Sequence, residues 1–362
     1  MRVIHLETGM HLYGGGEQVR CLIQGLSNCG VENILVCAEG SAIAQATAAN
    51  DVVEIRSRGD LDFFLYHRLK VLLHSISPDL LHVHSRRGAD WFGGCAAAKC
   101  NIPAVLTRRV DNPEVAFAAR VKYRSYRAVI AISRAIETLL VKGVGLSQSR
   151  VRRIESAVDT ERFCPDEGRD RLLAATELSG DVDLIGVVAQ LIPRKGHDVL
   201  LGILPALIDH YPRLRVLFFG QGSEAGKLQH RIRKLNLNEY VKMLGFRDDL
   251  PRLLSGLDLL VHPARREGMG VAVLQGMSAG VPVVASNVGG ITDIIQDGVQ
   301  GILIEPDDPP ALIGALQCLL GDSELRNRFG SAGRSHVEEK FSISRMTESH
   351  LEIYGSVSEG RL

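Results

Sequence analysis

The chain has 362 residues, more than the roughly 100–200 of a typical domain, so we expect two domains. Apolar residues make up 45% of the chain and charged residues 23%, which excludes an intrinsically disordered protein. The 42 basic and 42 acidic residues balance, so no nucleic-acid partner is expected and any attraction to an anionic surface must come from a local patch.

Short apolar segments alternate with amphipathic helical patterns along nearly the whole chain. In the first half, strands are predicted at residues 3–6, 33–38, 52–55, 80–84, 104–107 and 128–133. In the second half, they are predicted at residues 184–189, 215–220, 240–245, 257–262, 282–286 and 301–304. Helical patterns such as residues 17–29 and 309–320 lie between them. Continuous apolar strands separated by helices are typical of covered parallel sheets, so the sequence predicts an α/β protein with two doubly wound, Rossmann-like domains.

The predicted domains are residues 1–168 and 169–342, followed by a C-terminal helical segment at 343–362. Proline, glycine and charged residues interrupt the strand–helix alternation between 163 and 177. The last segment comes after the second sheet is complete, so we expect it to cross back onto the first domain. Ligands of open α/β sheets bind beyond the carboxyl ends of the strands, which predicts a substrate cleft between the two domains.

Cysteine usage and the N-terminal sequence bear on the compartment. The seven cysteines form no Cys-x-x-Cys pair, which argues against a zinc site or a disulfide framework and favours a reducing compartment. The N-terminal sequence has an acidic residue and lacks the apolar core of a signal peptide. The uncharged segment 268–292 contains proline and several glycines, which a membrane-spanning helix would not favour. We therefore predict a cytoplasmic protein with no transmembrane segment.

A glycine-rich segment at residues 14–17, Gly-Gly-Gly-Glu, follows the first predicted strand and opens a helix. Glycines there let a backbone approach a phosphate or sugar, and a helix N-terminus favours an anion. A plain glycine-rich turn is the alternative interpretation. The segment lacks the Gly-x-Gly-x-x-Gly order of dinucleotide-binding proteins, which argues against a nicotinamide oxidoreductase.

Two adjacent basic residues, Arg194 and Lys195, follow the predicted strand at 184–189. A guanidinium group and an ammonium group at a strand end can neutralise a diphosphate. A solvated basic turn is the alternative.

The most specific pattern begins at His262, where a strand is predicted to end. A loop then presents Glu267, two glycines expose backbone N–H groups, and an apolar helix follows whose N-terminus favours a phosphate. Gln275 lies eight residues after Glu267, about two helical turns along the same face, so both could contact one elongated ligand. A helix cap with a charged loop is the alternative, but it explains the pattern poorly because glycine is unfavourable in a first helical turn.

Taken in order, these motifs resemble the retaining, nucleotide-sugar-dependent glycosyltransferases of family 4, which have the GT-B fold. The family's Glu-x7-Glu element begins Glu-Gly-Phe-Gly and is matched by residues 267–270. Further matches follow in the family's order at residues 219–222, 244–246, 258–263, 289–293 and 297–301. In the N-terminal half, residues 14–17 fit the glycine loop of the acceptor domain and residues 81–84 fit its histidine strand.

The resemblance implies that a sugar is transferred, with retention, from a UDP-, GDP- or ADP-linked donor to a glycan or glycolipid acceptor, as in cell-surface polysaccharide or lipopolysaccharide core synthesis. It implies no obligatory cofactor and no metal. In the implied mechanism, negative charge grows on the leaving diphosphate and is stabilised by cations and backbone N–H groups. The implied catalytic residues are Glu267, which holds sugar hydroxyls, His84, which contacts the transferred sugar, and Lys195 and Arg194 beside the diphosphate. The implied donor-binding residues are Gly15, Gly16, Phe246, Arg247, Gly268, Met269, Gly270, Val271 and Gln275.

Some positions depart from the family pattern. Gln275 replaces the second glutamate, which binds the ribose, and this weakens ribose binding by about 1 kcal/mol. Gln190 stands where the family has arginine in Gly-Arg-Leu-x-x-x-Lys-Gly, although Lys195 is kept. Residues 156–159 read Ser-Ala-Val-Asp in place of Asn-Gly-Val-Asp. Two alternative functions follow: a catalytically weakened nucleotide-sugar-binding relative, or a nucleotide-sugar epimerase on the same fold.

Residues 84–134 carry ten basic and three acidic residues, a net charge of +7 in a neutral protein. The residues predicted to form this patch are Arg86, Arg87, Arg108, Arg109, Arg120, Lys122 and Arg124. Such a patch favours docking to an anionic membrane leaflet or binding of a phosphorylated glycolipid acceptor. A solvated basic face is the alternative, and the sequence assigns no oligomeric state.

Overall fold

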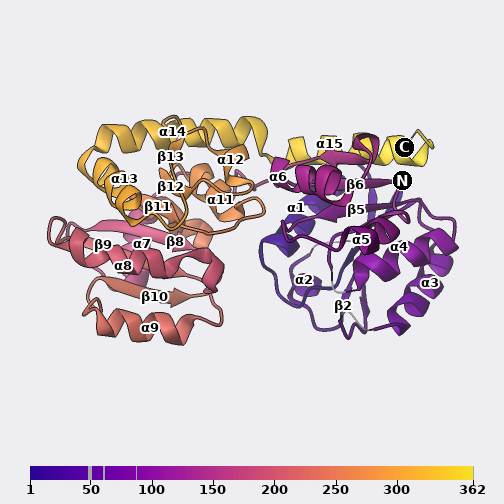
Figure 1. The fold of residues 1–362 in the computed structure, drawn as a ribbon, viewed down its shortest axis with the longest axis horizontal. Helices are drawn as coiled ribbons and strands as arrows, with labels where there is room; N and C mark the ends of the chain where they lie inside the picture. The colour runs from indigo at the N-terminus through magenta and orange to yellow at the C-terminus, as the bar shows by residue number, and fades with distance from the viewer. Residues whose placement is uncertain (48–50, 60–61, 87, 362) are drawn as a thin grey trace. The chain divides into compact units, whose positions relative to one another are not determined.

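The computed structural model describes residues 1–47, 51–59, 62–86 and 88–361, and the chain divides into two compact units (Figure 1). Unit 1 comprises Met1–Ala157 and Ile343–Leu362, and unit 2 comprises Val158–Ser342. Residues 158–168, predicted to end the first domain, therefore belong to unit 2. The reason is a set of hydrogen bonds: the Phe163 carbonyl accepts from Ser278 Oγ at 2.6 Å and from Arg334 Nη1 at 2.8 Å.

Unit 1 is built on a parallel sheet whose described strands have the order β3-β2-β1-β4-β5-β6-β7. The strands are β1 (Arg2–Glu7), β2 (Glu32–Ala38), β3 (Asp51–Ile55), β4 (Leu80–Val83), β5 (Ala104–Arg108), β6 (Ala128–Ala131) and β7 (Val151–Arg153). In the register of β1 and β4, His5 is opposite His82. The apolar strands are buried on both sides, as a parallel sheet covered by helices requires.

The helices of unit 1 cover this sheet. They are α1 (Gly14–Asn28), α2 (Ala42–Ala46), α3 (Phe64–Ile76), α4 (Ala89–Lys99), α5 (Ala116–Tyr123), α6 (Arg134–Thr138), the π-helix η1 (Leu139–Val144), the 3-10 helix η2 (Gln148–Arg150) and α15 (Ile343–Ser358). The last helix, α15, packs beside α1 and buries Met346, Ile353, Tyr354 and Val357 in the same hydrophobic cluster as strand residues such as Val3. The C-terminal segment thus completes the core of unit 1.

Unit 2 is built on a second parallel sheet, with the described strands in the order β10-β9-β8-β11-β12-β13. The strands are β8 (Asp183–Val188), β9 (Leu214–Phe219), β10 (Val241–Gly245), β11 (Leu259–His262), β12 (Val283–Ser286) and β13 (Gly301–Ile304). The helices are α7 (Gly168–Thr176), η3 (Pro193–Lys195), α8 (His197–Ile208), α9 (Ala225–Lys234), α10 (Leu250–Leu253), η4 (Leu254–Gly256), α11 (Val271–Ser278), α12 (Ile291–Ile294), α13 (Pro309–Gly321) and α14 (Ser323–Lys340).

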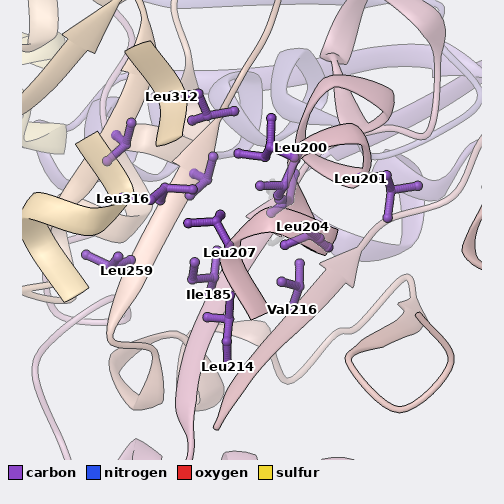
Figure 2. Close-up of a cluster of buried hydrophobic side chains, with 14 of the residues drawn as sticks. Ile185, Leu200, Leu201, Leu204, Leu207, Leu214, Val216, Leu259, Leu312 and Leu316 are labelled. Atoms are coloured by element: carbon purple, nitrogen blue, oxygen red, sulfur yellow. The ribbon is translucent and has the colours of Figure 1, made fainter. Parts of the chain in front are cut away.

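The core of unit 2 is a cluster of leucine, isoleucine and valine side chains (Figure 2). Leu200, Leu204 and Leu207 of α8 meet Leu312 and Leu316 of α13 over the sheet, and all five are buried. Burial of one such side chain contributes about 1.5–3 kcal/mol, so this layer holds α8 and α13 against the sheet. The candidate site lies beyond those two strand ends.

The predicted fold class, α/β with two Rossmann-like parallel sheets, is confirmed. The sequence missed one strand, β7, because Val151-Arg-Arg is short and offers only one apolar residue to a sheet edge. Within the described part of the chain, no helix is both long enough and apolar enough to cross a membrane.

Candidate functional site

In unit 2, the loops after β8 and β11 bring three ionisable side chains together. Lys195, in η3, donates a hydrogen bond from Nζ to Oε2 of Glu267. His262, the last residue of β11, lies with Nε2 2.7 Å from the same oxygen. The other carboxylate oxygen accepts from the Gly268 backbone N–H at 3.1 Å. All three side chains are buried. They form a charged, hydrogen-bonded group at the carboxyl ends of β8 and β11.

The surroundings of Glu267 keep its carboxylate ionised. Burial opposes ionisation, but hydrogen bonds from His262 and the positive charge of Lys195 hold the pKa of Glu267 well below its usual range. Burial also lowers the pKa of His262, so its ring is neutral and donates Nε2–H to the carboxylate. The pair of Lys195 and Glu267 is thus a buried salt bridge with a third, neutral donor.

Two glycines permit the close approach of the loops that carry these groups. Gly196, directly after Lys195, has a φ of +70°, and a Cβ atom there would lie 1.8 Å from the Pro263 carbonyl oxygen. Gly289 has a φ of +53°, and its Cβ would lie 1.8 Å from the Glu267 carbonyl oxygen. The N–H of the next residue, Gly290, donates to that same carbonyl at 3.3 Å. Any side chain at either position would push the loops apart.

Arg265 ties the loop after β11 to its neighbours. Its guanidinium group forms a two-point salt bridge with Asp198, at 2.8 and 2.9 Å, and contacts Asp307 at 2.8 Å. It also donates to the Pro193 carbonyl at 2.7 Å. This geometry holds the η3 turn, and with it Lys195, against the loop that presents Glu267.

The group retains capacity for a ligand. A carboxylate can accept about four hydrogen bonds, and Glu267 uses three of these in the contacts above. Lys195 has three N–H donors and gives one of them to Glu267. The helix α11 starts directly after Gly270, and no side chain caps it. The N–H groups of Val273 and Leu274 donate to the Gly270 carbonyl, which leaves the N–H groups of Val271 and Ala272 for a ligand. One acceptor and several donors therefore converge, which suits a sugar hydroxyl next to a phosphate.

Four of the predicted donor residues lie next to this group in sequence or contact its loop. Gly268, Met269 and Gly270 are buried between Glu267 and α11. Arg194 is exposed and donates to the Arg266 carbonyl at 3.3 Å.

Gln275 is half-buried on α11, of which Val271 is the first residue. Glu267 lies in the loop before this helix, so the predicted two-turn helical spacing between Glu267 and Gln275 is wrong. After β10, Phe246 is 52% exposed and Arg247 forms a salt bridge with Asp249 at 2.6 Å.

In unit 1, a pocket of about 340 Å³ opens beyond the carboxyl ends of β1, β4 and β5. It gathers most of the residues that the sequence predicted in this half of the chain: Gly15, Gly16, His84, Arg86, Arg108 and Arg109. Glu7 and Asp90 also line it, so its walls carry charges of both signs. The pocket lies between the glycine turn at the start of α1 and His84, which follows β4.

Part of the predicted basic patch is internal. Lys122 is 4% exposed and binds Asp90 at 2.8 Å and Glu114, while Arg108 is 2% exposed and lies 3.4 Å from Glu114. These two basic residues cannot contact a membrane, because their side chains are buried and paired with Asp90 and Glu114. Arg86, Arg120 and Arg124 are exposed, and Arg87 lies outside the described residues.

The sequence interpretation missed four polar residues of these two regions. His262 and Arg265 stood inside the recognised motif but were given no role, although a histidine that ends an apolar strand is a signal for a site. His5 and Asn33 were overlooked as well. Each is a polar residue in an otherwise apolar strand of a parallel sheet, which is the pattern that should have identified them.

Two family models match the chain. The model described as glycosyl transferases group 1 matches residues 169–336, and the model described as glycosyltransferase family 4 matches residues 13–162. D-inositol 3-phosphate glycosyltransferase of Salinispora tropica is 32% identical over 231 residues, which are 59% of this chain and 48% of that protein. GDP-mannose-dependent monoacylated alpha-(1-6)-phosphatidylinositol monomannoside mannosyltransferase of Corynebacterium glutamicum is 32% identical over 216 residues, 56% of this chain and 55% of that protein. The matched segments thus span about half the length of these relatives.

The fold also matches that of solved structures. The structure of HepE from Anabaena, in complex with UDP, superposes with a TM-score of 0.86 over 98% of this chain and 100% of that chain, at 20% identity. WaaG, a glycosyltransferase involved in lipopolysaccharide biosynthesis, superposes with a TM-score of 0.75 over 98% of this chain and 99% of that one, at 17% identity. Two family models that follow one another along the chain and a shared two-sheet architecture lead to one conclusion: the chain belongs to the group 1 glycosyltransferases with the GT-B fold.

Proposed function

We propose that the protein transfers a sugar, with retention of anomeric configuration, from a nucleoside-diphosphate sugar to a glycan or glycolipid acceptor. The observation that carries this proposal is the buried group of Lys195, Glu267 and His262 beside the uncapped N-terminus of α11. This group offers donors for a diphosphate and an acceptor for a sugar hydroxyl at the neighbouring ends of β8 and β11. The roles of the residues follow from that chemistry.

The donor side is formed by unit 2. Lys195 and the first-turn N–H groups of α11 bind the diphosphate and stabilise the negative charge that grows on it as the glycosidic bond breaks. Glu267 accepts a hydrogen bond from a sugar hydroxyl, and exposed Arg194 adds a second cation. Gln275 binds the ribose, and backbone groups around Phe246 and Arg247 contact the base. The UDP bound to HepE supports a nucleoside-diphosphate donor for this protein. The base of that donor is uracil, guanine or adenine.

The acceptor side is formed by the pocket of unit 1. Its polar walls suit a hydroxyl-rich acceptor, and His84 contacts the transferred sugar. The relatives named above act on inositol 3-phosphate and on a phosphatidylinositol mannoside, which supports an acceptor of the polyol or glycolipid class. Transfer to a cell-surface polysaccharide or a lipopolysaccharide core falls within that class.

A donor screen tests the proposal. With UDP-, GDP- and ADP-sugars, the cognate donor at 100 times its dissociation constant should stabilise the folded protein by about 2.7 kcal/mol, measured as a shift in Tm. Lys195→Met should remove most of this shift because it removes the cation beside the diphosphate. Lys227→Met, which changes an exposed lysine on α9 of the same unit, should keep it. If none of the three donor classes shifts the Tm, the proposed donor site is wrong.

Product analysis separates the proposal from its two alternatives. A transferase slowly releases nucleoside diphosphate from its donor, and faster when its acceptor is present. An epimerase converts one nucleotide sugar into another with no acceptor. A binding protein that has lost catalysis gives the Tm shift with neither product, and this outcome would point to the substitutions at Gln190 and Gln275.

We also propose that unit 1 docks on an anionic membrane surface. Several large apolar side chains on α3, α4 and α5, or directly before them, are exposed: Phe63 (70%), Phe64 (76%), Trp91 (38%), Val115 (76%), Phe117 (78%) and Val121 (41%). We call these six residues the apolar rim. The helices that carry them are neighbours, since α3 packs against α4 and α4 against α5. Arg120 and Arg124 are exposed on or next to α5, whereas nearby Asp90 and Glu114 are neutralised by Lys122 and Arg108. Apolar side chains beside unpaired positive charge fit a lipid surface better than a protein partner.

Liposome sedimentation tests the membrane proposal. The protein should sediment with vesicles that contain phosphatidylserine or phosphatidylglycerol and stay in the supernatant with neutral vesicles, since each basic residue near the surface contributes about 1 kcal/mol. Replacing Phe63, Phe64 and Phe117 with serine should reduce binding at least tenfold. Val299→Ser, at an exposed apolar residue of unit 2, is the control and should have no effect. Equal partitioning onto neutral and anionic vesicles would contradict the proposal.

A further inference from the structure

A chain of buried polar side chains leads from β2 to the pocket of unit 1. His5 Nε2 lies 3.0 Å from Asn33 Oδ1, and His5 Nδ1 lies 3.0 Å from His84 Nε2. His84 Nδ1 then lies 3.4 Å from Nη2 of Arg109. Asn33, His5 and His84 are all buried, and both His84 and Arg109 line the pocket. The four residues come from β2, β1 and the ends of β4 and β5, so the parallel register of the sheet sets their spacing.

The orientation of the Asn33 amide determines the direction of every hydrogen bond in this series of side chains. The amide nitrogen of Asn33 donates to the Val31 carbonyl at 2.9 Å and to Ser27 Oγ at 3.0 Å. Because a carbonyl can only accept, the amide nitrogen faces Val31 and the amide oxygen faces His5. His5 must therefore donate from Nε2, which leaves the lone pair of its neutral ring on Nδ1.

The same donor–acceptor argument applies to His84. Since His5 Nδ1 accepts, His84 must carry its proton on Nε2 and present a lone pair at Nδ1. The other end agrees independently, because a guanidinium group has only donors, so Arg109 also requires an acceptor at His84 Nδ1. Both histidines are neutral: burial lowers the pKa of His5 to about 4, and burial with the neighbouring His82, His5 and Arg109 lowers that of His84 well below its usual value.

We propose that Asn33 and His5 are positioning residues that fix His84 in the Nε2–H tautomer, so that His84 meets the substrate only as a hydrogen-bond acceptor. The inference rests on the proposed function for the contact between His84 and a sugar. It adds a specificity rule: the ligand group beside His84 is a hydroxyl, which takes the place of Arg109 as the donor to Nδ1 and accepts from the guanidinium group. A carbonyl or ether oxygen has no hydrogen to give to Nδ1, so Arg109 is its only partner there.

The three histidines on this face of the sheet also resemble a metal site, since ring nitrogens of His5, His82 and His84 lie within 4.8 Å of one another. Hydrogen bonds already account for these nitrogens, because His82 bonds the Tyr354 hydroxyl at 2.5 Å and Thr107 Oγ1 at 2.7 Å. The group contains no carboxylate, and the guanidinium of Arg109 lies beside it. A bound divalent ion would displace the proton that the proposal places on His84 Nε2.

The tautomer can be observed directly, without any assay of transfer. In long-range ¹H–¹⁵N spectra of histidine-labelled protein, the signals that disappear in His84→Gln belong to His84. We expect a pyrrole-type Nε2 and a pyridine-type Nδ1 at neutral pH. The opposite pattern, a doubly protonated ring, or stoichiometric zinc in the purified protein would overturn the proposal, whether or not the protein transfers sugar.

Asn33→Leu is the decisive variant because it removes the acceptor for His5 Nε2–H at nearly constant volume. Without that acceptor, His5 no longer has to hold its proton on Nε2, so its Nδ1–H can donate to His84 and the His84 proton can lie on Nδ1. We expect pyrrole-type character to appear at Nδ1 of His84 and the kcat of donor turnover to fall about tenfold, with the donor KM within twofold. Unchanged His84 signals in folded Asn33→Leu would overturn the proposal.

Two further variants separate positioning from packing. His5→Asn retains an amide oxygen that can accept from His84 Nε2, so it should keep the wild-type tautomer and restore turnover to within about threefold. His350→Gln changes a buried histidine of α15 whose ring lies 5.6 Å from that of His82 and which bonds the Met346 carbonyl. It should leave the His84 signals unchanged, and a tautomer change in this control would contradict the assigned route.

Discussion

Replacing Glu267 with alanine should reduce sugar transfer by about a thousandfold and also destabilise unit 2. The change removes the acceptor for a sugar hydroxyl and the anion that holds Lys195, and the loss of one such electrostatic contact costs about 10²–10³ in kcat. It also leaves a buried ammonium group unpaired, which costs about 3–5 kcal/mol. The kcat of donor turnover and the free energy of unfolding in urea measure the two effects separately.

A double variant distinguishes these two effects. In Glu267→Gln with Lys195→Met, both charges are absent, so most of the lost stability should return because no buried charge is left unpaired. Turnover should stay low. If the double variant recovers both stability and turnover, Glu267 has only a structural role and the proposed site is wrong.

The same carboxylate makes stability depend on pH. Its pKa is lowered in the folded protein, so it binds fewer protons there than in the unfolded chain. Its contribution is therefore complete above the ordinary glutamate pKa of about 4.3 and is lost as the pH falls below that value. The difference in unfolding free energy between the wild type and Glu267→Gln should be constant near neutral pH and shrink below about pH 4.3.

The second large effect is expected at Gly196, where no catalytic group is changed. Gly196→Ala places a Cβ atom 1.8 Å from the Pro263 carbonyl oxygen and forces alanine to a φ of +70°. The left-handed backbone costs about 1–2 kcal/mol, and relief of the overlap costs about 1–3 more. Because the loops must separate, Lys195 moves away from Glu267, and donor affinity should fall at least tenfold. Urea unfolding and the donor-induced shift in Tm measure both consequences.

Gly298→Ala is the matched control for this prediction. Gly298 has a similar φ of +73°, but a Cβ atom there would meet nothing within 4 Å. It should lose only the backbone part, about 1–2 kcal/mol, and keep its donor affinity. Equal losses in the two variants would mean that contact with Pro263 is unimportant.

Much of the architecture was predictable from the sequence because parallel strands are buried on both faces and read as continuous apolar runs. The family resemblance, which rested on the order of several motifs, is confirmed by the two family models. The sequence also predicted that the motifs of Lys195 and Glu267 follow strand ends, and the pairing of β8 with β11 in the structure explains why the two residues meet.

What the sequence could not predict are pairings set by tertiary contacts. The net charge of residues 84–134 suggested that Lys122 and Arg108 lie on the surface. In the structure both are internal and form salt bridges with Asp90 and Glu114. Composition does not reveal which cation meets which carboxylate. The spacing of Glu267 and Gln275 failed for a related reason, because where a helix begins depends on the positive φ of Gly270 as well as on periodicity.

The return of α15 to unit 1 has a consequence for how the chain folds during synthesis. Unit 2 is one continuous segment, whereas unit 1 needs residues that leave the ribosome after all of unit 2. Until Met346, Ile353 and Tyr354 arrive, the nascent first unit exposes the apolar face of α1 that α15 later covers. We therefore expect the order usual for multidomain chains, in which the N-terminal domain folds first, to be reversed, with unit 1 complete only after α15 has left the ribosome.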